Sequence, residues 1–260
     1  MTTSPEKWQT WIESRNRFFA NPTGFLSVLD LVWLTDQPQE VTGLTGSWWA
    51  EGTTVHVKDS ATGDHSWNVS ERPETMFDFD GIVVELAERN NQMVVRPRDP
   101  NSPMLKNFEG VITFDYDASY CVEANFVPFD APKEVVVDSV VDGFKIAYVS
   151  PGVLEFVIAG QAQKLTTFEK IGSEDLTIYY KDLTSGNLSY GTGRMVTANK
   201  QLDGTFIIDF NYSGNFPCSY TDFATCPVAP HENKLNVAVE AGEKKPIYRN
   251  TAEGIISQVH

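Results

Sequence analysis

The chain has 260 residues and a formal net charge of −15, from 35 acidic and 20 basic residues. Hydrophobic residues make up 41% and charged residues 21%, which is close to ordinary globular usage and excludes a disordered or fibrous chain. The negative charge repels phosphate backbones and anionic lipid, so neither nucleic acid nor a membrane surface is an expected partner.

The first residues lack a basic region followed by an apolar run, and no apolar stretch is long enough to span a bilayer. We therefore expect a cytoplasmic protein. Three cysteines, an odd and sparse set, favour reduced thiols over a disulfide framework. No motif predicts a cofactor.

Aromatic residues at helical spacing predict an amphipathic helix over residues 4–20, with Ser4 as its cap and Pro5 at its first position. Such a helix packs its apolar face on its own domain or docks a partner, and we expect the first. The apolar run 25–34 is short, and its pattern fits either a second helix or a buried strand.

From residue 46 onward, short alternating or β-branched segments separated by turn signals predict strands. They cover residues 53–57, 81–86, 92–96, 111–115, 120–126, 133–138, 144–149, 153–158, 161–168, 176–182, 195–198 and 205–210. This series predicts an all-β dominated, β-rich α+β fold, an antiparallel meander that forms a barrel or sandwich with one or two N-terminal helices packed on it.

No repeat or linker divides the chain, so we expect a single domain over 1–260. It comprises an N-terminal helical segment over 1–34 and a β domain over 46–245. The tail 249–260 is polar without an obvious packing face, and we expect it to be poorly ordered.

The segment from about Tyr190 to Glu243 holds most of the residues suited to chemistry. Its glycine pair before Arg194 precedes a strand rather than a helix and lacks the third glycine and the lysine of phosphate-binding loops, which disfavours nucleotide binding. Arg194 and Asp209 lie on the two arms of a predicted hairpin and are expected to face each other. If both point inward, Asp209 orients a guanidinium that holds a carboxylate or phosphate; otherwise they form a surface ion pair.

Two further arginines, Arg96 and Arg98, end a predicted strand within a proline-rich stretch. Prolines stiffen the backbone and hold side chains in place. These arginines add cationic donors to an anion pocket or belong to a rigid solvent-facing turn.

The loop over 209–233 contains Cys218, Cys226 and His231. As zinc ligands these residues have a spacing that matches no familiar zinc motif. As a nucleophile, Cys218 or Cys226 needs a lowered pKa and a base within reach. The third interpretation makes both cysteines small buried hydrophobes that line the loop.

Several short motifs together resemble a known family of bacterial and archaeal proteins, domain of unknown function 1684. They are Leu26 to Leu34, Arg96-Pro97-Arg98-Asp99, Phe108-Glu109-Gly110, Tyr190-Gly191-Thr192-Gly193-Arg194, Asp209-Phe210-Asn211, Asn215-Phe216-Pro217-Cys218, Ala224-Thr225-Cys226-Pro227, Asn233-Lys234-Leu235 and Ala241-Gly242-Glu243-Lys244. The resemblance implies one β-rich domain and no particular activity. It draws attention to Arg194, Asp209, Asn211, Asn215, Cys218 and Cys226.

The leading hypothesis is binding of a small polar or anionic molecule in a pocket of the β domain. Arg194 anchors it with help from Arg96 or Arg98, and Asp209 orients Arg194. Hydrogen bonds to the ligand come from Asn211, Asn215 and Tyr190. One alternative is a hydrolase or lyase that uses Asp209 as base or Cys218 as nucleophile, and another is a structural or partner-docking module built on the aromatic helix.

Overall fold

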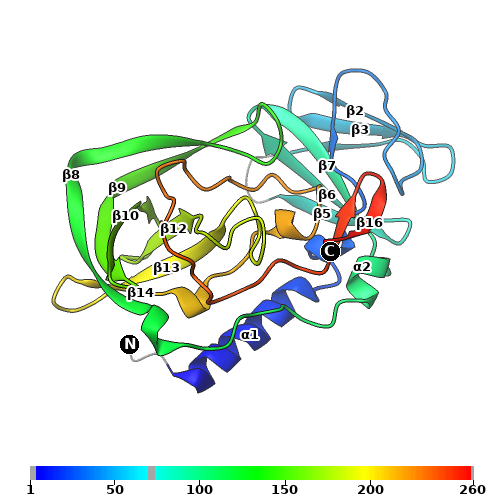
Figure 1. Ribbon diagram of the computed structural model, residues 1–260. Coiled ribbons are helices and arrows are strands. Elements are labelled where there is room, and N and C mark those ends of the chain that lie inside the picture. The colour runs from blue at the N-terminus through cyan, green and yellow to red at the C-terminus, as the bar shows by residue number, and fades with distance from the viewer. Residues whose placement is uncertain (1–3, 70–73, 259–260) are drawn as a thin grey trace.

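The computed structural model describes residues 4–69 and 74–258 (Figure 1). Helix α1 spans Pro5–Phe19, with the Ser4 side chain accepting a hydrogen bond from the Lys7 amide, as predicted. The buried ring of Phe19 packs on Tyr220 with a centroid distance of 4.2 Å. The helix therefore packs its aromatic face on its own protein.

A seven-stranded antiparallel sheet forms the larger part of the molecule. In sheet order its strands are β10 (Gln161–Thr166), β9 (Lys145–Ile158), β8 (Cys121–Asp138), β14 (Phe206–Asp209), β13 (Arg194–Lys200), β12 (Leu176–Tyr180) and β11 (Phe168–Glu169). β10 pairs with β9 at one edge and β11 pairs with β12 at the other, yet both belong to one continuous stretch, 161–169. The sheet therefore curls back on itself, as Figure 1 shows.

Three smaller antiparallel sheets lie beside the curled sheet. They contain β1 (Val32–Trp33), β7 (Gln92–Arg98), β6 (Ile82–Arg89) and β5 (Thr75–Phe79); β2 (Ser47–Glu51), β3 (Thr54–Lys58) and β4 (His65–Asn68); and the hairpin β15 (Tyr248–Thr251) with β16 (Gly254–Ser257). Short helices are η1 (Phe25–Ser27), α2 (Pro103–Lys106), η2 (Ala118–Tyr120), η3 (Phe210–Tyr212) and η4 (Pro217–Ser219). Trp48 of β2 is fully buried in an apolar core to which both the four-stranded and the three-stranded sheet contribute side chains.

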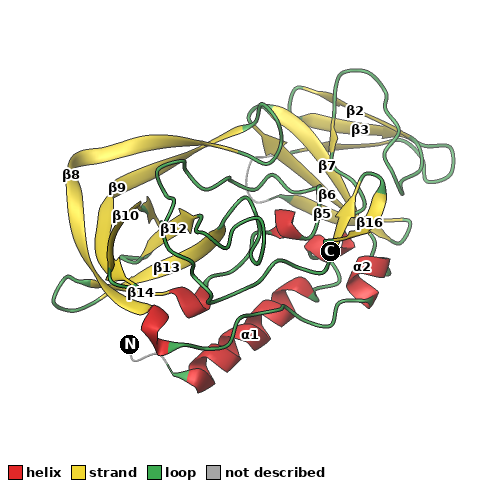
Figure 2. Ribbon diagram, in the orientation of Figure 1, coloured by secondary structure: helices red, strands yellow, loops and turns green. Residues whose placement is uncertain are grey.

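The inside of the curled sheet is filled partly by the irregular segment 233–243, and Figure 2 shows loop rather than helix there. Alternate residues of this segment are buried, which is the period of an extended chain. Its side chains Leu235, Val237 and Val239 join the core of the sheet. Gly242 has a φ of +75°, and a Cβ there would meet the Ser213 carbonyl oxygen at 2.5 Å, so this close approach requires glycine.

The β-rich α+β class with antiparallel strands and an N-terminal helix is confirmed. Several strand boundaries differ. The predicted strands 120–126 and 133–138 are one strand, β8. The prolines between them do not end the strand, because they lie in an irregularity where the register shifts between Pro128 and Lys133. Residues 144–149 and 153–158 likewise merge into β9, while 111–115 forms only an isolated bridge between Thr113 and Glu243.

The run 25–34 became η1 followed by the short strand β1, so neither predicted alternative covers all of it. The prediction of a poorly ordered tail over 249–260 is corrected for residues 249–258. The hairpin β15–β16 forms there, and residue Asn250 also bonds to the backbone of Tyr220 and Asp222. Residues 259–260 lie outside the described range. The single domain stays a prediction.

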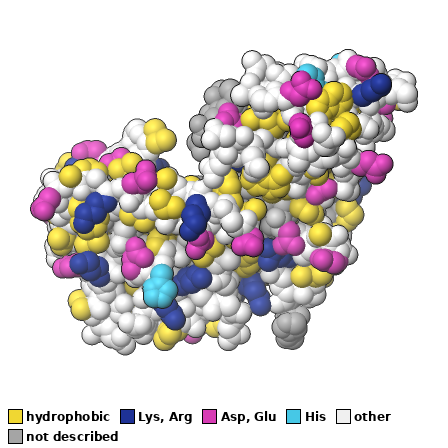
Figure 3. Space-filling view, turned by 90° about the horizontal axis from the view of Figure 1, so that it is seen from above, with side chains coloured by type: hydrophobic (Ala, Val, Ile, Leu, Met, Phe, Trp, Pro, Cys, Tyr) yellow, Lys and Arg dark blue, Asp and Glu magenta, His cyan; other side chains and the backbone are white. Residues whose placement is uncertain are grey.

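On the face seen from above in Figure 3, acidic and basic side chains are mixed on the left part of the molecule, and acidic side chains are more frequent on the upper right part. Within the described residues, no helix combines the length and apolar character that a membrane crossing needs.

Helix α1 is fastened to the irregular segment 233–243 by an ion pair between Arg15 and the fully buried carboxylate of Glu243. Replacing Arg15 by Met leaves that carboxylate without its cation, and we expect the free energy of unfolding to fall by about 3–5 kcal/mol. Urea unfolding followed by circular dichroism measures the change. Lys200→Met, which breaks an exposed pair with Glu174, is the matched control and should cost less than about 1 kcal/mol. Equal losses in the two variants would contradict this account of the helix contact.

Candidate functional site

Arg194 and Asp209 do not pair with each other, so that expectation was wrong. The ladder places Ile208 opposite Ala198 and Met195 opposite Gly214, which puts Arg194 several residues away from Asp209 along the hairpin. The expectation relied on similar distances from the turn near Leu202 and Asp203, which were a poor guide to register because β13 extends further from that turn than β14 does.

Arg194 is fully buried and its two terminal nitrogens bind protein groups. Nη2 donates to Asp182 Oδ2 at 2.7 Å and to the Val239 carbonyl at 2.9 Å. Nη1 donates to the carbonyls of Ala241 and Glu243. Only the buried Nε has no partner. Arg194 thus fastens segment 233–243 to the sheet and has little capacity left for a ligand.

The other residues of the late segment are also buried and engaged. Asn211 bonds to Asp209 Oδ1 and, through both amide atoms, to the backbone of Asp117. Asn215 donates to the Lys244 carbonyl, and its own backbone amide donates to Glu243. The structure buries these residues in separate groups: Arg194 and Asn215 both bond to Glu243, whereas Asp209 and Asn211 bond to each other and Asn211 to Asp117.

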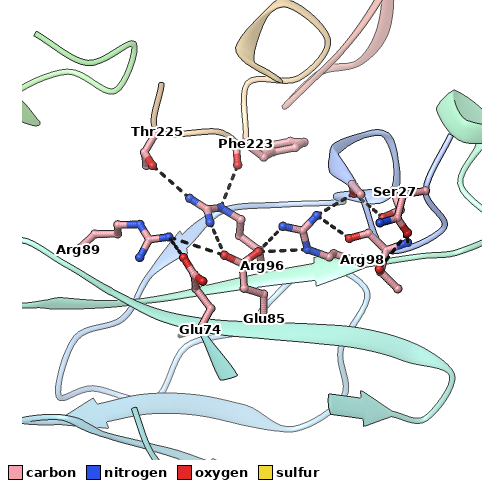
Figure 4. A network of polar contacts seen from close by, with 11 residues as sticks. Ser27, Glu74, Glu85, Arg89, Arg96, Arg98, Phe223 and Thr225 are labelled. Atoms are coloured by element: carbon pink, nitrogen blue, oxygen red, sulfur yellow. Dashed lines mark hydrogen bonds and ion pairs between the residues drawn. The ribbon is translucent and has the colours of Figure 1, made fainter. Parts of the chain in front are cut away.

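Arg96 and Arg98 face inward, which corrects the prediction of a solvent-facing turn. Both bind the buried carboxylate of Glu85, with Arg96 Nη1 at 2.5 Å from Oε1 (Figure 4). Arg96 also donates to the Phe223 carbonyl and to Thr225 Oγ1. Because β6 pairs with β7 in register, Glu85 lies directly opposite Arg96. Arg96 therefore connects the four-stranded sheet to the cysteine-containing loop, and Arg98 connects it to the carbonyls of Thr23 and Gly24.

Burial raises the pKa of Glu85, but the charges of Arg96 and Arg98 and their hydrogen bonds outweigh it, so the pKa lies below its usual range. A carboxylate whose pKa is lowered in the folded state stabilises the protein at pH values above the range in which glutamate usually titrates. That stability is lost as the pH falls through the folded-state pKa.

The two loop cysteines meet, whereas the histidine does not join them. The Cys218 amide donates to Cys226 Sγ at 3.4 Å, and both side chains are buried. Tyr190 donates its hydroxyl to the Cys218 carbonyl at 2.7 Å. His231 is exposed, and within residues 4–69 and 74–258 no group of three or more candidate ligands could hold a metal ion.

A cleft of about 780 Å³ lies where the sequence predicted no site. One wall is the stretch 103–112, and the opposite wall is residues 246–248 with Ile255 of β16. Tyr220 also lines it, and its ring contacts Phe108 at 6.2 Å between centroids. The Asn16 side chain of α1 accepts a hydrogen bond from the Val111 amide at 2.8 Å, so the helix supports the first wall.

Four apolar side chains at the cleft are exposed. Ile112, Ile247, Tyr248 and Ile255 leave 36%, 39%, 49% and 44% of their surface accessible, and all four line the cleft. Contiguous exposed apolar surface marks binding sites more often than a scatter of single residues does. The apolar pair Ile255-Ile256 in the tail could have indicated this cleft, but the tail was expected to be poorly ordered and the pair was not considered.

The fold and the polar interior define a β-rich antiparallel protein whose motif residues fasten a long irregular segment inside a curled sheet. The model of the family described as protein of unknown function (DUF1684) matches residues 106–244, more than half of the chain. The chain belongs to this family, as the sequence motifs predicted.

A solved structure shows a further similarity. The solution NMR structure of an uncharacterized protein from Haloarcula marismortui is 31% identical in sequence, and the match covers 56% of this chain and 82% of that one, with a TM-score of 0.46. Comparison with curated proteins found no match.

Substituting Glu85 by Gln should leave two buried guanidinium groups without a counter-charge. We expect the free energy of unfolding at pH 7 to fall by about 3–5 kcal/mol. Because the wild type loses this contribution in acid, the difference between the two proteins should narrow as the pH falls below the usual glutamate range. Denaturant titrations at several pH values test this. The exposed Glu174→Gln is the control, and a wild-type difference that does not depend on pH would refute the assignment.

Proposed function

We propose that this protein binds a small molecule with a large apolar part and a polar or anionic group in the cleft between residues 103–112 and the β15–β16 hairpin. The observation that carries the proposal is the gathering of four exposed apolar side chains around one concave surface. Ligand sites are concave, mostly apolar and about 300–1,000 Å³ in volume. The cleft, at about 780 Å³, falls within that range.

The lining indicates the chemistry of the ligand. Phe108, Tyr220 and Tyr248 offer aromatic surface, against which flat or aliphatic groups bury area worth about 25 cal/mol per Å². Lys106 contributes a positive charge that suits a carboxylate, sulfonate or phosphate group, and Glu109 offers an acceptor for a hydroxyl or amine. This assigns the anchoring role to Lys106, in place of the predicted Arg194.

The enzyme and docking alternatives have less support. Neither Asp209 nor Cys218 lines the cleft, and each is buried. Asp209 Oδ1 accepts hydrogen bonds from the backbone and side-chain nitrogens of Asn211. The aromatic face of α1, which a docking module would offer, contacts Tyr212 and Tyr220 of the same chain.

Binding of 1-anilinonaphthalene-8-sulfonate, which combines an aromatic body with an anionic group, tests the proposal by fluorescence titration. The wild type should bind one equivalent. Ile255→Glu places a charge in the apolar wall and should raise the Kd about tenfold, equivalent to about 1.4 kcal/mol. Lys106→Gln should raise it by a smaller factor and make binding less sensitive to salt.

Ile171→Glu is the matched control, since Ile171 is 98% exposed and lies outside the cleft lining. Its Kd should equal that of the wild type. Thermal melts of all three variants confirm that each remains folded. Probe binding that Ile255→Glu leaves unchanged would contradict the proposed site.

A further inference from the structure

We propose that Cys218 and Cys226 form a dithiol redox site, which a hydroperoxide converts to an intramolecular disulfide. The inference rests on the arrangement of side chains around the two sulfur atoms and does not depend on a ligand in the cleft. It also differs from a cysteine nucleophile acting on a substrate, since the second thiol is the reaction partner.

Cys218 and Cys226 both belong to one buried cluster of side chains. Cys218 belongs to η4, and its backbone amide points at Cys226 Sγ from 3.4 Å. Thr192 Oγ1 lies 3.9 Å from Cys218 Sγ. Eight positions separate the cysteines along the chain, so the loop between them folds back to bring the sulfur atoms together. A backbone amide and a hydroxyl aimed at a sulfur pair favour its anionic form.

Cationic groups approach the pair from two directions. On one side, Arg96 donates to the hydroxyl of Thr225, the residue before Cys226, and together with Arg98 it binds Glu85. On the other side, Arg249 of β15 acts on Cys218 and lies over the Tyr190 ring at 5.6 Å. Arg249 also pairs with Asp222 at 2.5 Å, but its buried Nε has no partner.

These surroundings shift the pKa values of the two thiols in opposite directions. The pKa of Cys218 is lowered in spite of burial, mainly by the hydrogen bond from Cys226 and further by Thr192, Arg249 and Tyr190. The hydrogen bond to Cys218, together with burial, raises the pKa of Cys226 well above its usual range. The pair therefore loses its first proton from Cys218, and Cys226 remains a thiol that stabilises the resulting thiolate.

The reaction balances with one hydroperoxide. The Cys218 thiolate attacks the peroxide oxygen, the O–O bond breaks, and the leaving hydroxide or alkoxide takes up a proton as Cys218 becomes a sulfenic acid. Cys226 then attacks that sulfur, releasing water and forming the S–S bond. Two thiols are oxidised by two electrons, and the peroxide is reduced to two molecules of water, or to water and an alcohol.

Burial limits which oxidants can reach the site. Cys218 is 0% and Cys226 7% exposed, so any oxidant needs a local opening, and a compact oxidant needs a smaller opening than a bulky aromatic disulfide. In the folded protein we expect hydrogen peroxide to oxidise the pair much faster than the aromatic disulfide 5,5′-dithiobis(2-nitrobenzoate) derivatises it. Cys121, which is partly exposed, is replaced by Ser for this comparison so that only the two site thiols respond.

The test treats the folded full-length chain with one equivalent of hydrogen peroxide, blocks remaining thiols with iodoacetamide under denaturing conditions, and maps peptides by mass spectrometry. The expected product is a Cys218–Cys226 crosslinked peptide, lighter by two hydrogen atoms than the two thiol peptides. Cys121→Ser should give the same product. Cys226→Ser should give none and should instead accumulate a sulfenic acid on Cys218 that dimedone traps.

Arg249→Met should slow formation of the crosslink several-fold without preventing it. Recovery of both site cysteines fully alkylated after peroxide treatment would overturn the proposal. So would a crosslink that involves Cys121, or separate over-oxidation of each cysteine without a disulfide. A denatured sample treated in the same way shows whether any crosslink requires the folded arrangement.

Discussion

The buried guanidinium of Arg194 is the interaction on which the rest of the structure depends. A fully buried cation is costly unless it is paired and hydrogen-bonded, and here Asp182 supplies the charge while three backbone carbonyls of segment 233–243 complete the shell. Those carbonyls belong to a segment with few strand-like hydrogen bonds of its own. The Arg194 side chain therefore takes the place of a neighbouring strand and fixes an extended chain inside the curled sheet.

Other polar residues of the family motifs extend the same arrangement outward. Asn233 bonds through both amide atoms to Thr166 and also to the Tyr179 carbonyl, and so joins the stretch 161–169 to β12. The Glu243 carboxylate pairs with Arg15 of α1 and accepts a hydrogen bond from the backbone amide of Asn215. Immediately after this anchored stretch the chain forms the wall of the cleft at 246–248. The anchored stretch therefore ends directly before one wall of the cleft.

Much of the fold could be predicted from the sequence, because helical spacing with a Ser-Pro start and period-two alternation are local properties. The burial of Leu235, Val237 and Val239 inside the curled sheet was not predicted, because it depends on partners that are distant in the sequence. For the same reason the contacts of the predicted site residues could not be predicted. The sequence motifs singled out Arg194, Asn215 and Cys218, but a buried arginine that binds carbonyls and one that binds an anion have the same local sequence. Only the tertiary pairing with Asp182 distinguishes them.

Hydrogen–deuterium exchange in the wild type and in Arg194→Met tests the central role of this guanidinium most directly. Losing about 3 kcal/mol of local stability corresponds to roughly a hundredfold faster exchange through local opening. We expect that acceleration in peptides covering residues 233–248, while peptides from the β8–β9 hairpin keep their protection. Unchanged exchange in residues 233–248, or an equal loss of protection in every peptide, would contradict it.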